Sequence, residues 1–258
     1  MKANHNHLKV TIITVVFNGE DTIRDCIESV IGQSYPAIEY VIIDGKSTDK
    51  TPEIIANFGT KIDVFLSEKD NGIYDAMNKG IARSTGEIIG ILNADDFYRD
   101  PFVIEKIVAT LNATQADGVY GDLVYVDNKN TTKIKRYWKS GEFRRTQFLY
   151  GWMPPHPTFF LKRALYKRFG NYRTDLGSAA DYELMLRMLY KWHVKIAYLP
   201  EVITIMRLGG VSNKAIGNRI QANHNDRAAW QRNGLKPYWF TLYLKPLRKV
   251  LQFVYKPK

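Results

Sequence analysis

Along the first hundred residues, short apolar runs alternate with segments in which apolar residues recur every three or four positions. Nearly continuous β-branched runs are typical of strands buried on both faces, and the three-to-four spacing is typical of helices. The short connections between them indicate a mostly parallel sheet with helices on both faces, which is an α/β fold. The predicted strands are residues 10–17, 40–43, 64–66 and 87–92, and the predicted helices begin near residues 21, 51 and 73.

The pattern is less regular after residue 100, although no repeat or low-complexity tract interrupts it. Residues 118–126 and 133–138 predict two more strands, and helical spacing returns at residues 162–169, 181–190 and 216–231. We therefore expect a single domain. Its predicted parts are a disordered tail at 1–8, a first half at 9–127, a second half at 128–234 and a basic amphipathic segment at 235–258.

Charge is distributed unevenly over the 258 residues. Residues 1–128 carry a formal charge of −9 and residues 129–258 carry +20, which gives the net charge of +11. The acidic half suggests a metal partner, and the basic half suggests an anionic surface or phosphate. The single cysteine, Cys26, excludes a disulfide framework and falls in a helical pattern, where a buried structural thiol is expected. No segment approaches the ~18 uncharged apolar residues of a membrane span.

Acidic residues stand where the predicted strands end. Asp44 follows the second strand, Glu68 to Asp70 follow the third, Asp95 and Asp96 follow the fourth, and Asp122 lies in the later strand at 118–126. Ligands of parallel α/β sheets bind at this edge, and carboxylates gathered there destabilise each other unless a cation or hydrogen-bond donors meet them. Oxygen ligands without nearby His or Cys favour Mg²⁺ or Mn²⁺, usually shared with a substrate phosphate. The alternative, that the acid pair only caps the next helix, does not explain Asp44.

Three blocks of the sequence occur in this order: "TIITVVFN", "IIDGKSTDKT" and "GEIIGILNADDFY". Together they resemble the nucleotide-binding half of glycosyltransferase family 2, the inverting enzymes of the GT-A fold, and the resemblance extends over about residues 9–210. It implies that residues 9–127 bind a nucleotide sugar and that residues 128–234 bind the acceptor and carry the catalytic residue.

The resemblance also implies roles for residues of the first block and the second. Phe17 and Asn18 would flank the base of the nucleotide, Asp44 would hydrogen-bond that base, and Asp70 would close the same pocket. Lys46 departs from the family, which usually has a small residue there.

The third block stands where the family has its Asp-x-Asp motif. By resemblance, Asp95 holds Mn²⁺ or Mg²⁺ under the diphosphate, with Asp96 beside it. Asn93 replaces the first carboxylate of the motif, and an amide there can still bond a ribose hydroxyl.

The segment "GSAADYELMLRM" places Asp181 at the start of a predicted helix. In the family a carboxylate here is the general base that takes the proton of the acceptor hydroxyl. The family motif is Glu-Asp, whereas Ala180 precedes the aspartate here, so Asp181 would act alone. The alternative is that Asp181 only caps the helix.

Three basic residues are candidates for the diphosphate or the acceptor. His156 lies in "WMPPHPTFF", between prolines, and the family often has a His in this loop near both substrates; a structural role is the alternative. Arg207 and Lys214 flank the glycine-containing residues 208–212, a predicted lid, and either would clamp a diphosphate unless both are ordinary surface charges.

The segment "KPYWFTLYLKPLRKVLQFVYKPK" at the C-terminus is rich in aromatic and basic residues and has no acid. Such a segment is typical of contact with an anionic membrane, and packing of its aromatics on the domain is the alternative. Pro246 predicts a kink in any helix there.

We therefore expect a metal-dependent inverting glycosyltransferase. It would move a single sugar from a nucleoside-diphosphate sugar to a hydroxyl of a glycan or lipid-diphosphate-linked acceptor in cell-envelope polysaccharide biosynthesis. It would act in the cytoplasm, peripherally on the inner face of the membrane. A sugar nucleotidyltransferase would need a Gly-rich basic loop after the first strand, which "FNGEDTI" lacks. A nucleic-acid partner is not expected because the basic residues are scattered and the first half is acidic; an inactive membrane-binding homologue remains a third alternative.

Overall fold

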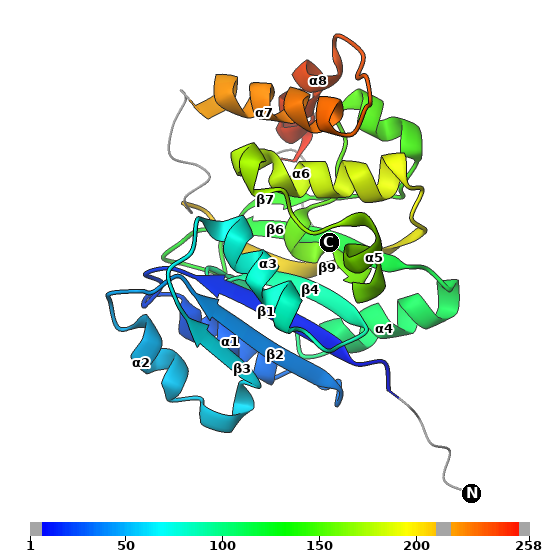
Figure 1. Ribbon diagram of the computed structural model, residues 1–258. Coiled ribbons are helices and arrows are strands. Elements are labelled where there is room, and N and C mark those ends of the chain that lie inside the picture. The colour runs from blue at the N-terminus through cyan, green and yellow to red at the C-terminus, as the bar shows by residue number, and fades with distance from the viewer. Residues whose placement is uncertain (1–6, 210–217, 253–258) are drawn as a thin grey trace, which may run out of the picture.

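The computed structural model describes residues 7–209 and 218–252 (Figure 1). Within them, nine strands form one mixed sheet in the order β3-β2-β1-β4-β8-β6-β9-β5, with β7 added beside β6. The strands are β1 Val10–Val16, β2 Ile38–Asp44, β3 Val64–Ser67, β4 Ile88–Asn93, β5 Asp96–Tyr98, β6 Gly118–Val126, β7 Ile134–Trp138, β8 Phe160–Lys162 and β9 Ile196–Arg207.

The first half of the chain supplies the parallel part of the sheet, β3-β2-β1-β4. All seven residues of β1 are buried, because helices cover both faces. Side chains alternate along a strand, so Ile13 and Val15 share a core with α3 on one face, while Ile12 and Val16 share one with α1, α2 and α4 on the other. These helices are α1 Ile23–Ile31, α2 Thr51–Ala56, α3 Ile73–Arg83 and α4 Val103–Thr114.

The second half adds the antiparallel pairs β4–β8, β6–β8, β6–β7 and β5–β9, and the parallel pair β6–β9. The sequence pattern did not predict β5 or β9, and the segment predicted as a helix at 181–190 is α-helical only to Met185 and π-helical beyond it. Figure 1 shows α7 and α8 above α6, at the end of the molecule away from α2. The helices are α5 Arg163–Phe169, α6 Ala180–Met185, α7 Asn218–Arg232 and α8 Thr241–Leu251.

The described part of the C-terminal segment packs on the domain, which is the alternative to membrane contact given above. Thr241 Oγ1 donates a hydrogen bond to the Leu149 carbonyl at 2.6 Å, and Lys245 Nζ lies 2.7 Å from both carboxylate oxygens of Asp226. The helix α8 continues through Pro246. No helix in the described part of the chain is both long enough and apolar enough to cross a bilayer.

At the other end of the parallel strands, where β1 and β2 begin, the buried carboxylate of Glu39 joins neighbouring segments. Glu39 accepts hydrogen bonds from Thr11 Oγ1 at 2.5 Å, from the Thr85 backbone N–H at 2.7 Å and from Lys9 Nζ at 3.0 Å. These donors outweigh burial and lower the pKa of Glu39 to about 2.

Cys26 is buried in α1, and burial raises the pKa of its thiol to about 12, which confirms the prediction of a buried structural cysteine. Of the tail predicted as disordered, residues 1–6 lie outside the described residues, and the carbonyl of Leu8 accepts a hydrogen bond from the Tyr35 hydroxyl at 2.8 Å.

Candidate active site

Asp44 lies at the end of β2 and is fully buried. Its carboxylate accepts hydrogen bonds from Ser47 Oγ at 2.5 Å and from Ser67 Oγ at 2.6 Å, and the Ser47 backbone N–H adds a third donor at 3.1 Å. Sequence reasoning missed both serines, although Ser47 stands in the quoted second block. Asp44 therefore holds the loop after β2 against the end of β3.

The structure brings Phe17, Asp44 and Asp70 together around Gly45. A Cβ atom built on Gly45 would lie 2.5 Å from Asp70 Oδ2 and 3.5 Å from Phe17 Cβ. Asp70 is fixed by the Gly72 backbone N–H, which donates to its Oδ1 at 2.9 Å, while the ring of Phe17 is 64% exposed. The result is an exposed aromatic ring beside an ordered carboxylate at the carboxyl ends of β1 and β2.

Asn18 ties the loop after β1 to the loop after β2. Its backbone N–H donates to Ser47 Oγ at 2.7 Å, and its side-chain oxygen accepts from the Thr48 backbone N–H at 2.9 Å. Asn18 adopts a left-handed conformation with φ +50°, and Lys46 does the same with φ +65°. Asn tolerates this region better than most residues, so Asn18 suits the sharp turn.

Asp95 lies in the turn between β4 and β5, and Asp96 is the first residue of β5. Asp96 is fully buried, and among the described residues neither of its carboxylate oxygens has a hydrogen-bond donor. Burial, followed by the neighbouring charge of Asp95, raises the pKa of Asp96 well above its usual value. Burial also raises the pKa of Asp95. Asn93 and Arg207 oppose the rise at Asp96, and His156 and Arg207 oppose it at Asp95, but burial outweighs them, so the pair would gain from a further cation.

Arg207, at the end of β9, braces this turn. Its guanidinium forms an ion pair with Asp25 of α1, donates to the Asp95 carbonyl at 3.0 Å and lies 4.8 Å from the ring centre of Phe97. The guanidinium is 5% exposed. Its contacts thus fix the backbone that carries the acid pair. Lys214, the other proposed diphosphate clamp, lies outside the described residues, as does most of the predicted lid.

Three residues from distant parts of the chain converge next to the acid pair. His156 Nε2 lies 3.2 Å from Asn93 Nδ2 at the end of β4, and His156 Nδ1 lies 3.5 Å from Asp181 Oδ2 in the first turn of α6. Burial lowers the pKa of His156, although Asp181 and Asp95 oppose that shift. The backbone N–H of Tyr182 donates to Asp181 Oδ1 at 2.7 Å, which leaves Oδ2 facing the imidazole. The arrangement presents a carboxylate and a neutral imidazole together at the sheet edge.

Asp122, another acid in a predicted strand, has a structural role. Its carboxylate accepts hydrogen bonds from the Tyr137 hydroxyl at 2.5 Å, the Tyr198 hydroxyl at 2.8 Å and the Ser140 backbone N–H at 2.7 Å. Because all these donors belong to the protein, Asp122 links β6, β7 and β9 and is not part of the candidate site.

Arg136 is a partly buried cation that sequence reasoning did not single out. Its guanidinium lies 3.8 Å from the ring centre of Tyr125, across the β6–β7 pair. Burial raises the pKa of Tyr125 to about 12, Arg136 opposes the rise, and both Asp96 and Asp181 add to it. Tyr125, on which Arg136 stacks, is therefore within electrostatic reach of Asp96 and Asp181. In the sequence, the only indication was that Arg136 is a cation inside the strand predicted at 133–138.

A sequence profile described as glycosyl transferase family 2 matches residues 11–170 of the chain. The chain belongs to glycosyl transferase family 2. An uncharacterized glycosyltransferase of Mycobacterium tuberculosis is 32% identical over 180 residues, which cover 69% of this chain and 68% of the relative. The prediction of a glycosyltransferase is thereby confirmed.

Solved structures of other glycosyltransferases share the fold. S. aureus TarS, in a complex with UDP-GlcNAc, aligns with a TM-score of 0.69 at 17% identity, covering 92% of this chain and 69% of that one. The mannosyltransferase PcManGT from Pyrobaculum calidifontis, in a complex with GDP-Man and Mn²⁺, aligns with a TM-score of 0.64 at 20% identity, covering 92% and 68%. These alignments confirm the predicted GT-A fold of this family 2 glycosyltransferase.

The acid pair of this glycosyltransferase fits a divalent cation. Both oxygens of Asp96 are buried without a donor, and carboxylate oxygens suit a hard ion such as Mn²⁺ or Mg²⁺. Among the described residues, no cluster of three or more His, Cys, Asp or Glu side chains forms a complete metal site. Two carboxylates leave several positions of such an ion to water and substrate phosphate, which is the usual arrangement for Mg²⁺.

Proposed function

We propose that this glycosyltransferase moves one sugar, with inversion, from a nucleoside-diphosphate sugar to a hydroxyl of a glycan or lipid-diphosphate-linked acceptor. The observation that carries the proposal is the convergence of Asn93, His156 and Asp181 beside Asp95 and Asp96. In this proposal Asp181 is the proton acceptor, and the buried acid pair beside it is where the divalent cation would bind.

Residues 9–127 bind the donor in this proposal. Phe17 and Asn18 flank the base, Asp44 and Asp70 accept its N–H groups and ribose hydroxyls, and Asn93 bonds the ribose. Asp44 already has donors from Ser47 and Ser67, so the base would replace one of these hydrogen bonds or share a carboxylate oxygen with it.

Asp95 and Asp96 would hold Mn²⁺ or Mg²⁺ in this proposal. The bound ion would offset negative charge on the departing nucleoside diphosphate. Arg207 acts through the backbone of Asp95, whose position it fixes, and Arg136, which stacks on Tyr125, would add positive charge to the field at the site. Lys214 would complete the clamp on the diphosphate.

Residues 128–234 bind the acceptor and carry out the proton transfer. Asp181 takes the proton of the acceptor hydroxyl, the oxygen forms a bond to the anomeric carbon, and the bond from that carbon to the diphosphate breaks on the opposite face. The sugar configuration is therefore inverted. His156, neutral at pH 7, holds the orientation of Asp181 Oδ2 and contacts the acceptor or the diphosphate.

The outer face of the C-terminal segment supports peripheral contact with an anionic membrane, at its cytoplasmic side. Trp239, Tyr243 and Leu247 recur every four residues and are 80%, 58% and 60% exposed. Exposed Lys236 and Arg248 flank this stripe. An aromatic stripe with adjacent cations suits the headgroup region of anionic lipids. A protein bound there would have direct access to lipid-linked acceptors of envelope polysaccharides.

The experiment that tests the proposed function is transfer from a panel of UDP-, GDP- and dTDP-sugars to lipid-diphosphate-linked and free glycan acceptors, with Mn²⁺ or with EDTA. We expect one donor to release its nucleoside diphosphate faster with acceptor and Mn²⁺ than with EDTA, and the product linkage to be inverted. Retained anomeric configuration, or equal rates in EDTA, would contradict the proposal. Synthesis of a nucleotide sugar from a sugar phosphate and a nucleoside triphosphate would favour the nucleotidyltransferase alternative.

A further inference from the structure

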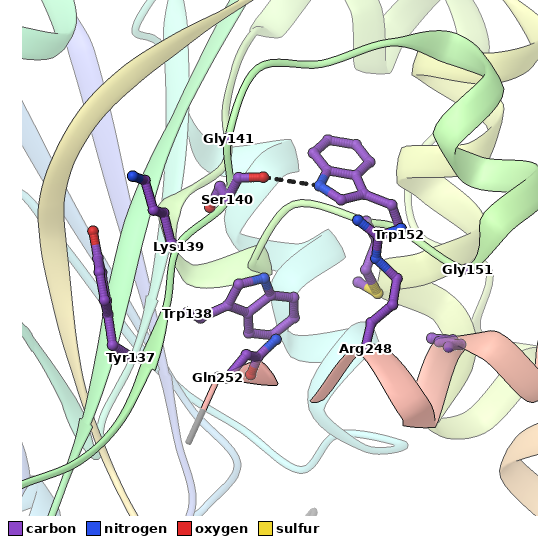
Figure 2. Close-up of a pocket in the computed structure, with 11 residues that line it drawn as sticks. Tyr137, Trp138, Lys139, Ser140, Gly141, Gly151, Trp152, Arg248 and Gln252 are labelled. Carbon is purple, nitrogen blue, oxygen red and sulfur yellow. Dashed lines mark hydrogen bonds between the residues drawn. The ribbon is translucent and has the colours of Figure 1, made fainter. Parts of the chain in front are cut away.

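A pocket of about 390 Å³ opens between the end of β7, the loop before the His156 turn, and α8 (Figure 2). Its size falls within the roughly 300–1,000 Å³ of small-molecule sites. It is distinct from the donor region because its walls come from residues 137–141 and 151–153, from Lys245 and Arg248 of α8, and from Gln252 just after that helix. No residue proposed to bind the nucleotide lines it.

Two tryptophans form the apolar part of the pocket. Trp152 is 4% exposed, and its indole N–H donates to the Ser140 carbonyl at 3.0 Å, so it is a fixed wall. Trp138 is half-buried and lies across the pocket from Trp152 in Figure 2. A partly accessible indole facing a fixed one offers a flat platform for a sugar ring.

The polar part of the pocket is positive. No Asp or Glu lines it, whereas Lys139, Lys245 and Arg248 do. Lys245 is neutralised by Asp226, but no described residue forms an ion pair with Arg248. Figure 2 shows Arg248 extending from α8 toward Trp152. Its guanidinium is therefore available to bind a phosphate with two parallel hydrogen bonds.

Close backbone packing holds α8 in position as a wall of the pocket. Gly151 has φ +75°, and a Cβ there would lie 2.5 Å from Lys245 N and 2.8 Å from Lys245 Cα. Only glycine allows the loop and α8 to approach this closely. Lys245 Nζ also lies 3.8 Å from the ring centre of Tyr182, the neighbour of Asp181. The pocket wall is thereby connected to the helix that carries the proposed base.

A second connection joins the pocket to His156. Ser140 Oγ and Thr158 Oγ1 both donate to the carbonyl of Gly121, at 2.7 Å and 3.1 Å. Met153 lines the pocket only three residues before His156. The loop that lines the pocket therefore leads directly into the His156 turn.

We infer that this pocket binds the acceptor at a sugar ring that carries a phosphate or diphosphate, with Trp138 against the ring and Arg248 on the phosphate. The inference rests on the proposed function and adds the chemical class of the acceptor and the residues that select it. The phosphate has two sources, a soluble phosphorylated glycan or the diphosphate of a lipid carrier. Tyr243 and Leu247 lie on the same helix as Arg248, and Trp239 lies just before it; this exposed stripe would contact the chain of a lipid carrier.

The test measures the binding of GlcNAc 1-phosphate by saturation-transfer NMR. UDP and Mn²⁺ are present in excess so that the donor site is filled. We expect the sugar phosphate to bind the wild-type protein at least tenfold more tightly than GlcNAc does. Arg248→Gln and Trp138→Ala should each weaken its binding about tenfold. The matched controls are Arg168→Gln and Trp192→Ala, which alter an exposed cation and an exposed tryptophan that both pack on Phe169, outside the pocket; both should bind within twofold of wild type.

A second arm uses the same sugar as its farnesyl diphosphate ester in detergent micelles. Tighter binding of the ester, weakened by Tyr243→Ser together with Leu247→Ser, would assign the phosphate to a lipid carrier; equal binding would assign it to a soluble glycan. Equal binding of GlcNAc and GlcNAc 1-phosphate, no binding of either, or wild-type affinity in Arg248→Gln would overturn the inference. Titration of the same samples with UDP, GDP and dTDP separates the two proposals, because absence of binding of all three nucleotides by the wild type contradicts the proposed function itself.

Discussion

Replacing Asp181 by Asn tests the proposed base with little change in shape. The Asn side-chain oxygen can still accept the Tyr182 backbone N–H, which is bonded to Asp181 Oδ1 at 2.7 Å. What the variant loses is a group at the Oδ2 position, 3.5 Å from His156 Nδ1, that can take a proton. The perturbation is therefore chemical, and we expect it to cost at most about 1 kcal/mol of folding free energy.

The expected loss of activity is large. Positioned general bases contribute about 10²–10⁴ in rate, which corresponds to about 3–5 kcal/mol of transition-state stabilisation. Because Asp181 contacts only the acceptor in this account, kcat should fall by that factor while the donor KM changes less than threefold. Initial rates of nucleoside diphosphate release at saturating acceptor measure both constants.

Asp175→Asn is the matched control. Asp175 lies six residues before Asp181, is 49% exposed and is paired with Arg232, so its loss should leave kcat within twofold of wild type. If Asp181→Asn kept kcat within fivefold of wild type, Asp181 would be a helix cap only and the base assignment would be wrong.

Three further predictions concern the donor site, the second-half cation and the stability of the sheet. Gly45→Ala should weaken nucleotide affinity about tenfold by calorimetry, because its Cβ would lie 2.5 Å from Asp70 Oδ2; unchanged affinity would exclude Asp70 from the pocket. Arg136→Met should lower kcat about tenfold, whereas Lys135→Met, which removes a partly exposed cation paired with Asp127, should not; equal effects would contradict the role of Arg136. Glu39→Gln should lower the free energy of unfolding by about 3 kcal/mol at pH 7, since the folded pKa of Glu39 is about 2 against 4.5 unfolded. That contribution is complete above pH 4.5 and is lost as pH falls through 2, so denaturation curves of variant and wild type should converge there; a constant difference would refute it.

The parallel part of the fold was predictable because each of its elements has a strong local signal. The strand β1 is a β-branched run, and α1 has apolar residues at helical spacing before a stop at Gly32, so their bounds differ from prediction by one or two residues. The strand β9 was missed because Ile196–Arg207 alternates irregularly between buried and exposed residues and contains Pro200. Its position is set by pairing with β6, and the register of that pairing shifts between Tyr120 and Leu123. Long-range pairing of this kind leaves little trace in a local window.

The candidate site was predictable in composition but not in geometry. The motif residues Asp44, Asp95 and Asp181 were identified by resemblance, and strand order placed the first two at one edge of the sheet. The contact of His156 with both Asn93 and Asp181 depends on how η3 (His156–Thr158) meets α6, which no spacing in the sequence reports. The partners of Arg207 were missed for the same reason, because Asp25 lies far away in the chain.

The measurement that tests the central claim most directly is calorimetric titration of UDP and GDP with Mn²⁺ or with EDTA, on wild type and on Asp96→Asn. The account predicts that one nucleotide binds the wild type at least tenfold more tightly with Mn²⁺, and that Asp96→Asn abolishes this difference. Because neither oxygen of Asp96 has a described hydrogen-bond donor, the variant should also unfold at the same or a higher temperature than wild type in EDTA. Nucleotide affinity that is equal in Mn²⁺ and in EDTA, or a dependence on Mn²⁺ that survives in Asp96→Asn, would contradict the account.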